Sequence, residues 1–185
     1  MNSRVKMVVL CEDKQQEVFA RHFLKKRGFT GNIRFFPCPG GSQSGEQFVR
    51  SRYPLEVKEY RKQANHLSVG LVVLIDADTK TIQERLQQLD DALRENSQPL
   101  RQQNEKIAIF VPKRNIETWI HYLQGENVDE NTEKPYPKFP NNESICKPYI
   151  EELVSQCSQG NLNENAPLSL QAACGELQRI LPLLD

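Results

Sequence analysis

Carboxylate residues follow two apolar segments of the chain, at positions where they could bind a metal ion. Glu12 comes directly after the apolar run VKMVVLC, and Asp76 and Asp78 close the run VGLVVLIDAD. Ligands of open α/β sheets bind beyond the carboxyl ends of the strands, so acids that follow two such strands meet at one edge. Carboxylates brought together repel one another unless a cation neutralises them, and hard divalent cations prefer oxygen ligands. We therefore expect Glu12, Asp76 and Asp78 to bind Mg²⁺ or Mn²⁺.

Asp76 and Asp78 are separated by a single residue. Side chains two positions apart in a strand point to the same face, which would direct both aspartates into one site. Either aspartate could instead serve only to cap a helix that begins near Thr79, because aspartate is favourable at helix starts. The sequence leaves this simpler role open for each aspartate taken alone.

A third apolar run ends in charged residues. In IAIFVPKRNIETWI, Lys113 and Arg114 follow the run, and Glu117 lies in the first turn of the helix predicted next. One interpretation makes Glu117 a further metal ligand and Lys113 or Arg114 the group that neutralises a phosphate. The other is equally open, because the helix dipole favours glutamate in a first turn regardless of function. Trp119 falls on the apolar face of that helix and is expected in the core.

The elements that must position these residues alternate along the chain. Segments rich in apolar and β-branched residues, typical of buried strands, cover residues 5–11, 32–38, 69–78 and 106–112. Helical patterns cover residues 13–28, 47–65, 82–93 and 115–125, the second of them interrupted or kinked near Pro54. This alternation predicts an α/β fold with a mostly parallel central sheet and helices on both faces.

The composition changes after residue 125. Residues 126–142 hold three prolines and four asparagines, which is typical of a loop or linker. Apolar residues at helical spacing return around residues 143–158 and 168–181. We therefore expect a metal-binding α/β domain in residues 1–125 and a small C-terminal helical extension in residues 143–185 that packs back onto it.

Charge is unevenly distributed although the formal net charge is zero. Residues 1–66 contain 13 Lys and Arg against six Asp and Glu, and the rest of the chain has the opposite imbalance. Such a split permits a basic face that meets phosphates, with Lys58, Arg61 and Lys62 as candidates. A solvated helix surface would have the same composition and stays an open alternative.

The cysteines and the N-terminus bear on the compartment. Five scattered cysteines without a C-x-x-C pair favour reduced thiols over a disulfide framework or a zinc site. The N-terminal sequence turns acidic too soon for a signal peptide, and no apolar run is long enough to span a membrane. The sequence thus predicts a cytoplasmic protein that is not inserted in a membrane.

The acidic motifs resemble those of the Toprim domain, which topoisomerases, bacterial primases, recombination-mediator proteins and OLD-type nucleases share. That family has a glutamate at the end of its first strand and a D-x-D motif at the end of a later strand. Here Glu12 lies within VVLCEDKQQEVF, and Asp76 and Asp78 lie within LVVLIDADT, over a matching region of residues 4–124. Small Toprim-like proteins of bacterial defence loci also carry an acid in a helix after a Pro-ended strand, which Glu117 in PKRNIETW resembles.

The resemblance implies a nuclease that cleaves a phosphodiester bond of DNA or RNA with Mg²⁺ or Mn²⁺. It implies Glu12, Asp76, Asp78 and Glu117 as metal ligands, all four acting in catalysis together with Lys113. A protein partner such as an ATPase could deliver the substrate. One departure from the pattern is Asp13, which stands where the family usually has glycine after the first glutamate.

Two alternatives remain open on sequence grounds. The first is a non-catalytic metal- or nucleotide-binding module of a larger complex. The second is a response-regulator receiver domain, in which Asp76 would accept the phosphoryl group. The receiver would need Lys-Pro at the end of a late strand, whereas this chain has Pro112 followed by Lys113.

Overall fold

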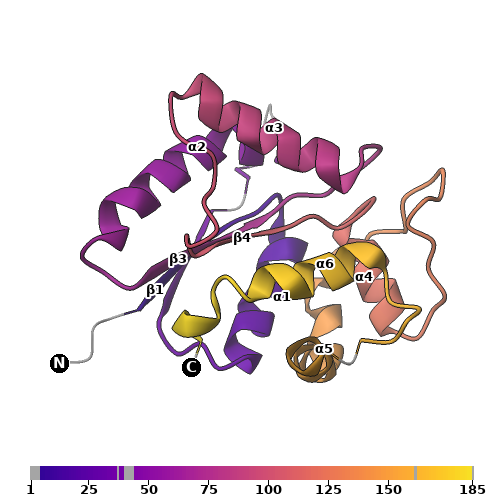
Figure 1. Cartoon of the computed structure of the whole chain (residues 1–185). Coiled ribbons are helices and arrows are strands. Elements are labelled where there is room, and N and C mark those ends of the chain that lie inside the picture. The colour runs from indigo at the N-terminus through magenta and orange to yellow at the C-terminus, as the bar shows by residue number, and fades with distance from the viewer. Residues whose placement is uncertain (1–4, 37, 40–43, 161, 185) are drawn as a thin grey trace.

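The protein is described here by a computed structural model that covers residues 5–36, 38–39, 44–160 and 162–184. Four parallel strands form one sheet in the order β2-β1-β3-β4 (Figure 1). Their bounds are β1 (Lys6–Leu10), β2 (Asn32–Phe36), β3 (Val69–Leu74) and β4 (Ile107–Phe110). The parallel sheet with helices around it confirms the predicted α/β class.

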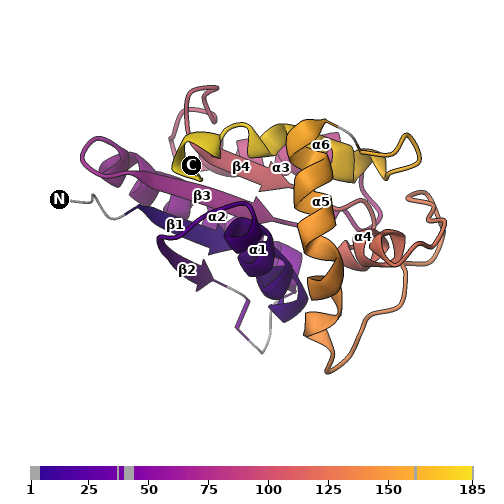
Figure 2. The same cartoon turned by 90° about the horizontal axis from the view of Figure 1, so that it is seen from below.

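Helices cover both faces of the sheet (Figures 1 and 2). The helices α2 (Gly45–Ala64) and α3 (Ile82–Glu95) lie on one face. The other face carries α1 (Lys14–Lys26), α4 (Ile116–Leu123), α5 (Lys147–Gln159) and α6 (Leu168–Leu177). The short 3₁₀ helix η1 (Glu143–Cys146) precedes α5, and a second one, η2 (Leu181–Leu183), follows α6. Among the described residues, no helix is both long enough and apolar enough to cross a membrane.

The two faces have separate apolar cores because side chains alternate along each strand. Every residue of β3 and β4 is buried, which explains their unbroken apolar sequences. Trp119 is fully buried against Phe19 on the α1 face, as predicted, and its indole nitrogen donates a hydrogen bond to the Ser169 hydroxyl at 2.8 Å. By contrast the residues of β2, one of the two edge strands, are only partly buried or exposed.

The helix α2 runs through Pro54 without a break, so the predicted interruption there is wrong. Val49, Tyr53 and Val57 lie one turn apart on α2 and are fully buried against the sheet. This continuous apolar contact compensates for the backbone hydrogen bond that proline removes.

The C-terminal helices pack on the sheet and are joined by a disulfide bond between Cys157 of α5 and Cys174 of α6. The expectation that all five thiols are reduced is therefore wrong for these two. Cysteine spacing alone could not reveal the pair, because the two residues meet only when α5 and α6 fold back against each other. Cys11, Cys38 and Cys146 are free thiols.

Candidate metal site

The candidate site lies where the connections of the sheet diverge. Helix α1 links β1 to β2 on one face, whereas α3 links β3 to β4 on the other. Neighbouring strands β1 and β3 thus form a topological switch point, and ligands of open α/β sheets bind beyond the carboxyl ends of such strands. Glu12 follows β1 and Asp76 follows β3 at this edge. The Glu12 carboxylate accepts a hydrogen bond from the backbone N–H of Asp76, so the structure brings the two residues together as expected.

Gln16 of α1 forms hydrogen bonds with both Glu12 and Asp76. Its side-chain nitrogen donates to Oδ1 of Asp76 at 2.9 Å, and its side-chain oxygen accepts from the backbone N–H of Glu12 at 2.7 Å. Asp13 caps α1 by accepting a hydrogen bond from the backbone N–H of Gln16. Gln16 is fully buried, and a polar residue on the buried face of α1 was the sequence signal that could have identified it.

Burial and mutual repulsion raise the pKa values of these acids. The pKa of Glu12 rises to about 8, chiefly because the carboxyl is desolvated, with Asp78 and Asp13 adding to the increase. The pKa of Asp76 lies well above its usual range, first through burial and then through the negative charges of Glu12 and Glu117. Binding of a proton or of a cation lowers the electrostatic energy of buried carboxylates that repel one another.

Glu117 is the second residue of α4, whose N-cap is Asn115. Its side chain is 2% exposed, unlike that of a solvated first-turn acid, and burial raises its pKa. The charge of Asp13 raises the pKa of Glu117 further, while Lys138 and His121 lower it. Glu117 thus faces the same acidic edge as Glu12 and Asp76.

Asp78 is directed differently from Asp76. The strand β3 ends at Leu74, so strand alternation does not extend to either aspartate, and Asp78 has a left-handed backbone with φ of 55°. Its carboxylate accepts a hydrogen bond from Nη2 of Arg85 at 2.9 Å and is half exposed. Among the described residues, Asp78 thus forms an ion pair with Arg85, whereas the Asp76 carboxylate has no such pair.

Arg85 of α3 organises this side of the site. It is 3% exposed, donates from Nε to the backbone oxygen of Asp76 at 3.0 Å, and pairs with Glu46 at the start of α2 at 3.1 Å. Sequence reasoning missed Arg85, although it lies three residues after Ile82 and four before Leu89, on the apolar face of its helix. A charged residue at such a position is a signal of a buried polar contact.

The two basic residues after β4 form their hydrogen bonds with backbone oxygens and not with the carboxylates of the described acids. The Lys113 ammonium group donates to the backbone oxygen of Lys80 at 3.2 Å. Arg114 has φ of 66°, and its guanidinium donates to the backbone oxygens of Asp78 and Glu133, both at 3.1 Å. These hydrogen bonds therefore stabilise the turn at residues 78–80.

The N-terminus of α2 packs tightly against Glu12. A Cβ atom on Gly45 would lie 2.7 Å from Cβ of Glu12, closer than packed atoms allow. Glycine at this position therefore lets the start of α2 approach the acid. The same helix start contributes Glu46, the second carboxylate partner of Arg85.

The donor set fits a hard divalent cation by its chemistry, because Glu12, Asp76 and Glu117 supply carboxylate oxygens whose charges are poorly compensated. Across residues 5–36, 38–39, 44–160 and 162–184, however, no three Asp, Glu, His or Cys side chains are already arranged around a common metal position. The Glu12 carboxylate is instead engaged by the backbone of Asp76.

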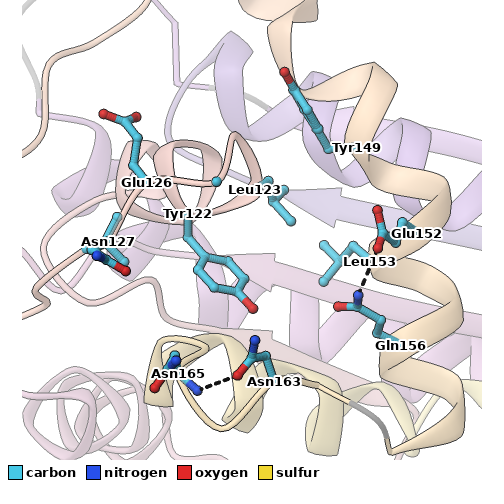
Figure 3. A pocket seen from close by; sticks show the side chains of 12 residues that line it. Tyr122, Leu123, Glu126, Asn127, Tyr149, Glu152, Leu153, Gln156, Asn163 and Asn165 are labelled. Atoms are coloured by element: carbon cyan, nitrogen blue, oxygen red, sulfur yellow. Dashed lines mark hydrogen bonds between the residues drawn. The ribbon is translucent and has the colours of Figure 1, made fainter.

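A cavity of about 470 Å³ lies away from these acids, between the C-terminal end of α4, helix α5 and the segment before α6 (Figure 3). Tyr122, Glu152 and Gln156 line it together with asparagine side chains. Its described lining contains two glutamates and no Lys or Arg, so it does not suit a phosphate group.

The comparisons with known proteins found no match to this chain among family models, curated proteins or solved structures.

Proposed function

We propose that this protein is a Toprim-like nuclease that cleaves a phosphodiester bond of nucleic acid with Mg²⁺ or Mn²⁺. The observation that carries the proposal is the hydrogen bond that joins Glu12 and Asp76 at the β1/β3 switch point, with Glu117 near enough for its charge to raise the pKa of Asp76. The Glu and D-x-D motifs of the sequence support it, because both lie at strand ends that adjoin in the sheet. A cytoplasmic setting, a role in bacterial defence and an ATPase partner belong to the same proposal.

Glu12, Asp76 and Glu117 would hold the cation, and Asp78 would join them if Arg85 released it. A cation held by these residues would supply Lewis-acid chemistry, the activation of a water molecule and the stabilisation of the leaving oxygen. In an alternative role, Glu117 would not bind the cation directly but would accept a proton from a water molecule, a role that its raised pKa supports. Arg85 positions the acids by holding the Asp76 backbone and the Asp78 side chain.

One observation favours a second candidate, a metal-binding module without catalysis. A nuclease needs cations near the scissile phosphate, but Lys113 and Arg114 are hydrogen-bonded to backbone oxygens of the turn after Asp78. If these contacts persist when the substrate binds, the site binds metal without stabilising the transition state.

The experiment that separates the two candidates is a cleavage assay. The purified protein is incubated with supercoiled plasmid, single-stranded DNA and single-stranded RNA, each with Mg²⁺, Mn²⁺ or EDTA. The variants are Asp76→Asn and Glu117→Gln, and Glu95→Gln is the matched control, because Glu95 is an exposed acid at the end of α3.

A nuclease should cut at least one substrate with metal, stop in EDTA, and lose roughly a hundredfold or more in rate in both site variants. Glu95→Gln should cut like the wild type. Cleavage that survives Asp76→Asn would exclude this site as its source. Metal binding without cleavage of any substrate would favour the non-catalytic module.

A further inference from the structure

A basic groove lies on the α2 face of the sheet, beside the edge strand β2. It has a volume of about 420 Å³, and its walls come from α2 and from the facing side chains of β1, β2 and β3. Five basic and two acidic side chains line it. The basic ones are Lys6, Arg34, Arg52, Lys58 and Lys62.

Most of this positive charge is not neutralised within the described part of the chain. Arg52 forms an ion pair with Glu56 at 3.0 Å, but Lys6, Arg34, Lys58 and Lys62 have no carboxylate partner among the described residues. Arg61 on the same helix differs, because Glu105 binds its guanidinium at 2.8 Å. Arg61, a candidate phosphate contact from sequence, therefore serves the fold, and the unpaired charge lies in the groove.

An aromatic ring at one end of the groove supports flat cationic groups. The guanidinium carbons of Arg34 and Arg52 lie 4.6 Å and 4.8 Å from the centroid of the Phe36 ring. Nucleic-acid bases of single strands stack on such guanidinium planes as well as on aromatic rings. Arg34 is exposed and lacks a carboxylate partner among the described residues, so one of its faces is available to a base.

This end of the groove adjoins the candidate metal site. Phe36 is the last residue of β2, and its carbonyl accepts a hydrogen bond from the backbone N–H of Cys11 at 3.1 Å. Cys11 directly precedes Glu12. The opposite end is formed by Lys6 and Val69, at the amino ends of their strands. The groove thus runs along the strands toward the acids.

We propose that a single strand of nucleic acid binds in this groove and is led along it to the carboxylates. Its phosphates contact the unpaired lysines, and a base stacks on Arg34 above Phe36. The inference rests on the proposed function, because it takes the bound strand to be the substrate.

The experiment measures binding separately from cleavage. Fluorescence anisotropy is recorded with labelled single strands of DNA and of RNA, about twelve nucleotides long, in EDTA and at several salt concentrations. The groove variant is Arg34→Gln/Lys58→Gln/Lys62→Gln, at three exposed positions. The matched control is Arg21→Gln/Lys25→Gln/Lys26→Gln, which removes the same charge from exposed positions of α1 on the opposite face. Circular dichroism and light scattering verify that both variants keep the fold and the oligomeric state of the wild type.

With three phosphates neutralised by Lys6, Lys58 and Lys62, the logarithm of the association constant should fall against the logarithm of salt concentration with a slope of about −2. The groove variant should bind at least tenfold more weakly at low salt, with a slope of about −1, whereas the α1 control should keep most of the wild-type affinity. The oligonucleotide that binds with the higher affinity, DNA or RNA, identifies the type of strand that the groove binds.

Three results would contradict the proposal that a single strand binds in the groove. They are no binding by the wild type, equal losses in the groove variant and the α1 control, or a groove variant that changes only self-association. Cleavage of a single strand by a protein that binds it outside the groove would leave the proposed function intact. Salt-dependent binding in the groove without any cleavage would contradict the proposed nuclease activity, and it would support the groove as a binding surface for a single strand.

Discussion

The carboxylate of Glu12 accepts a hydrogen bond from the backbone N–H of Asp76, which joins directly the residues that follow two neighbouring strands. This contact holds a carboxyl at a desolvated position, where its pKa rises from 4.5 to about 8. Glu12 is therefore protonated in the folded protein over a range of pH in which it is ionised in the unfolded chain. The stability of the protein must depend on pH through this difference.

We predict that the free energy of unfolding falls as pH rises from about 5 to about 8, since the folded state binds the proton more tightly. The contribution of Glu12 is fully present below pH 4.5 and is lost as pH passes through about 8. Asp76, whose pKa is also raised, acts in the same direction. Urea denaturation at several pH values measures the slope, and Glu12→Gln should flatten it because glutamine stays neutral. An unchanged slope in this variant would show that Glu12 is not the titrating group.

Gly45→Ala should destabilise the protein by about 1–3 kcal/mol, because the added Cβ atom overlaps Glu12. Helix propensity alone predicts the opposite sign, a gain of roughly 0.5–1 kcal/mol. Gly175→Ala is the matched control within α6, since a Cβ atom there meets no other atom within 4 Å. Urea denaturation of both variants measures the change in the free energy of unfolding. A similar gain in stability in the two variants would contradict the tight packing of α2 against Glu12.

Arg85→Met should cost about 2–4 kcal/mol of stability, because it leaves Asp78 and the backbone oxygen of Asp76 without their donor. Arg94→Met provides the comparison, since Arg94 forms an exposed pair with Asp91 and should cost less than about 1 kcal/mol. Equal losses, measured by chemical denaturation, would contradict a central structural role for Arg85.

The strands and the acids at their ends were predictable because both are local properties of the sequence. A run such as VGLVVL is buried on both faces wherever it occurs in a parallel sheet, and the acids after it must lie at the carboxyl edge. The switch point follows from strand order, which the sequence does not state. It brings Glu12 beside Asp76 because β1 and β3 are neighbours.

The partners of the acids were not predictable in the same way. Whether Asp78 pairs with Arg85 depends on a left-handed turn and on how α3 packs, and neither has a signal in the D-x-D motif itself. The direction of Lys113 is set likewise by the turn at Arg114. The visible signs of these contacts in the sequence were Arg85 and Gln16, polar residues on the apolar faces of their helices.

The disulfide between α5 and α6 should contribute about 3 kcal/mol, as expected for a loop closed over 17 residues. Protein denatured without reductant should show three reactive thiols, and reduction should lower the unfolding free energy of the wild type. The double variant Cys157→Ser/Cys174→Ser should be insensitive to reductant. Five reactive thiols after purification under oxidising conditions would contradict the bond.

Calorimetric titration of Mn²⁺ into the metal-free protein tests the central claim, that the acids after β1, β3 and β4 form a metal site. We predict saturable binding to the wild type and to the Glu95→Gln control, and at least tenfold weaker binding to Asp76→Asn and Glu117→Gln. The unfolding temperatures of all four proteins without metal establish that each is folded. Absence of binding to the wild type at millimolar Mn²⁺, or equal affinity in all four proteins, would contradict the account.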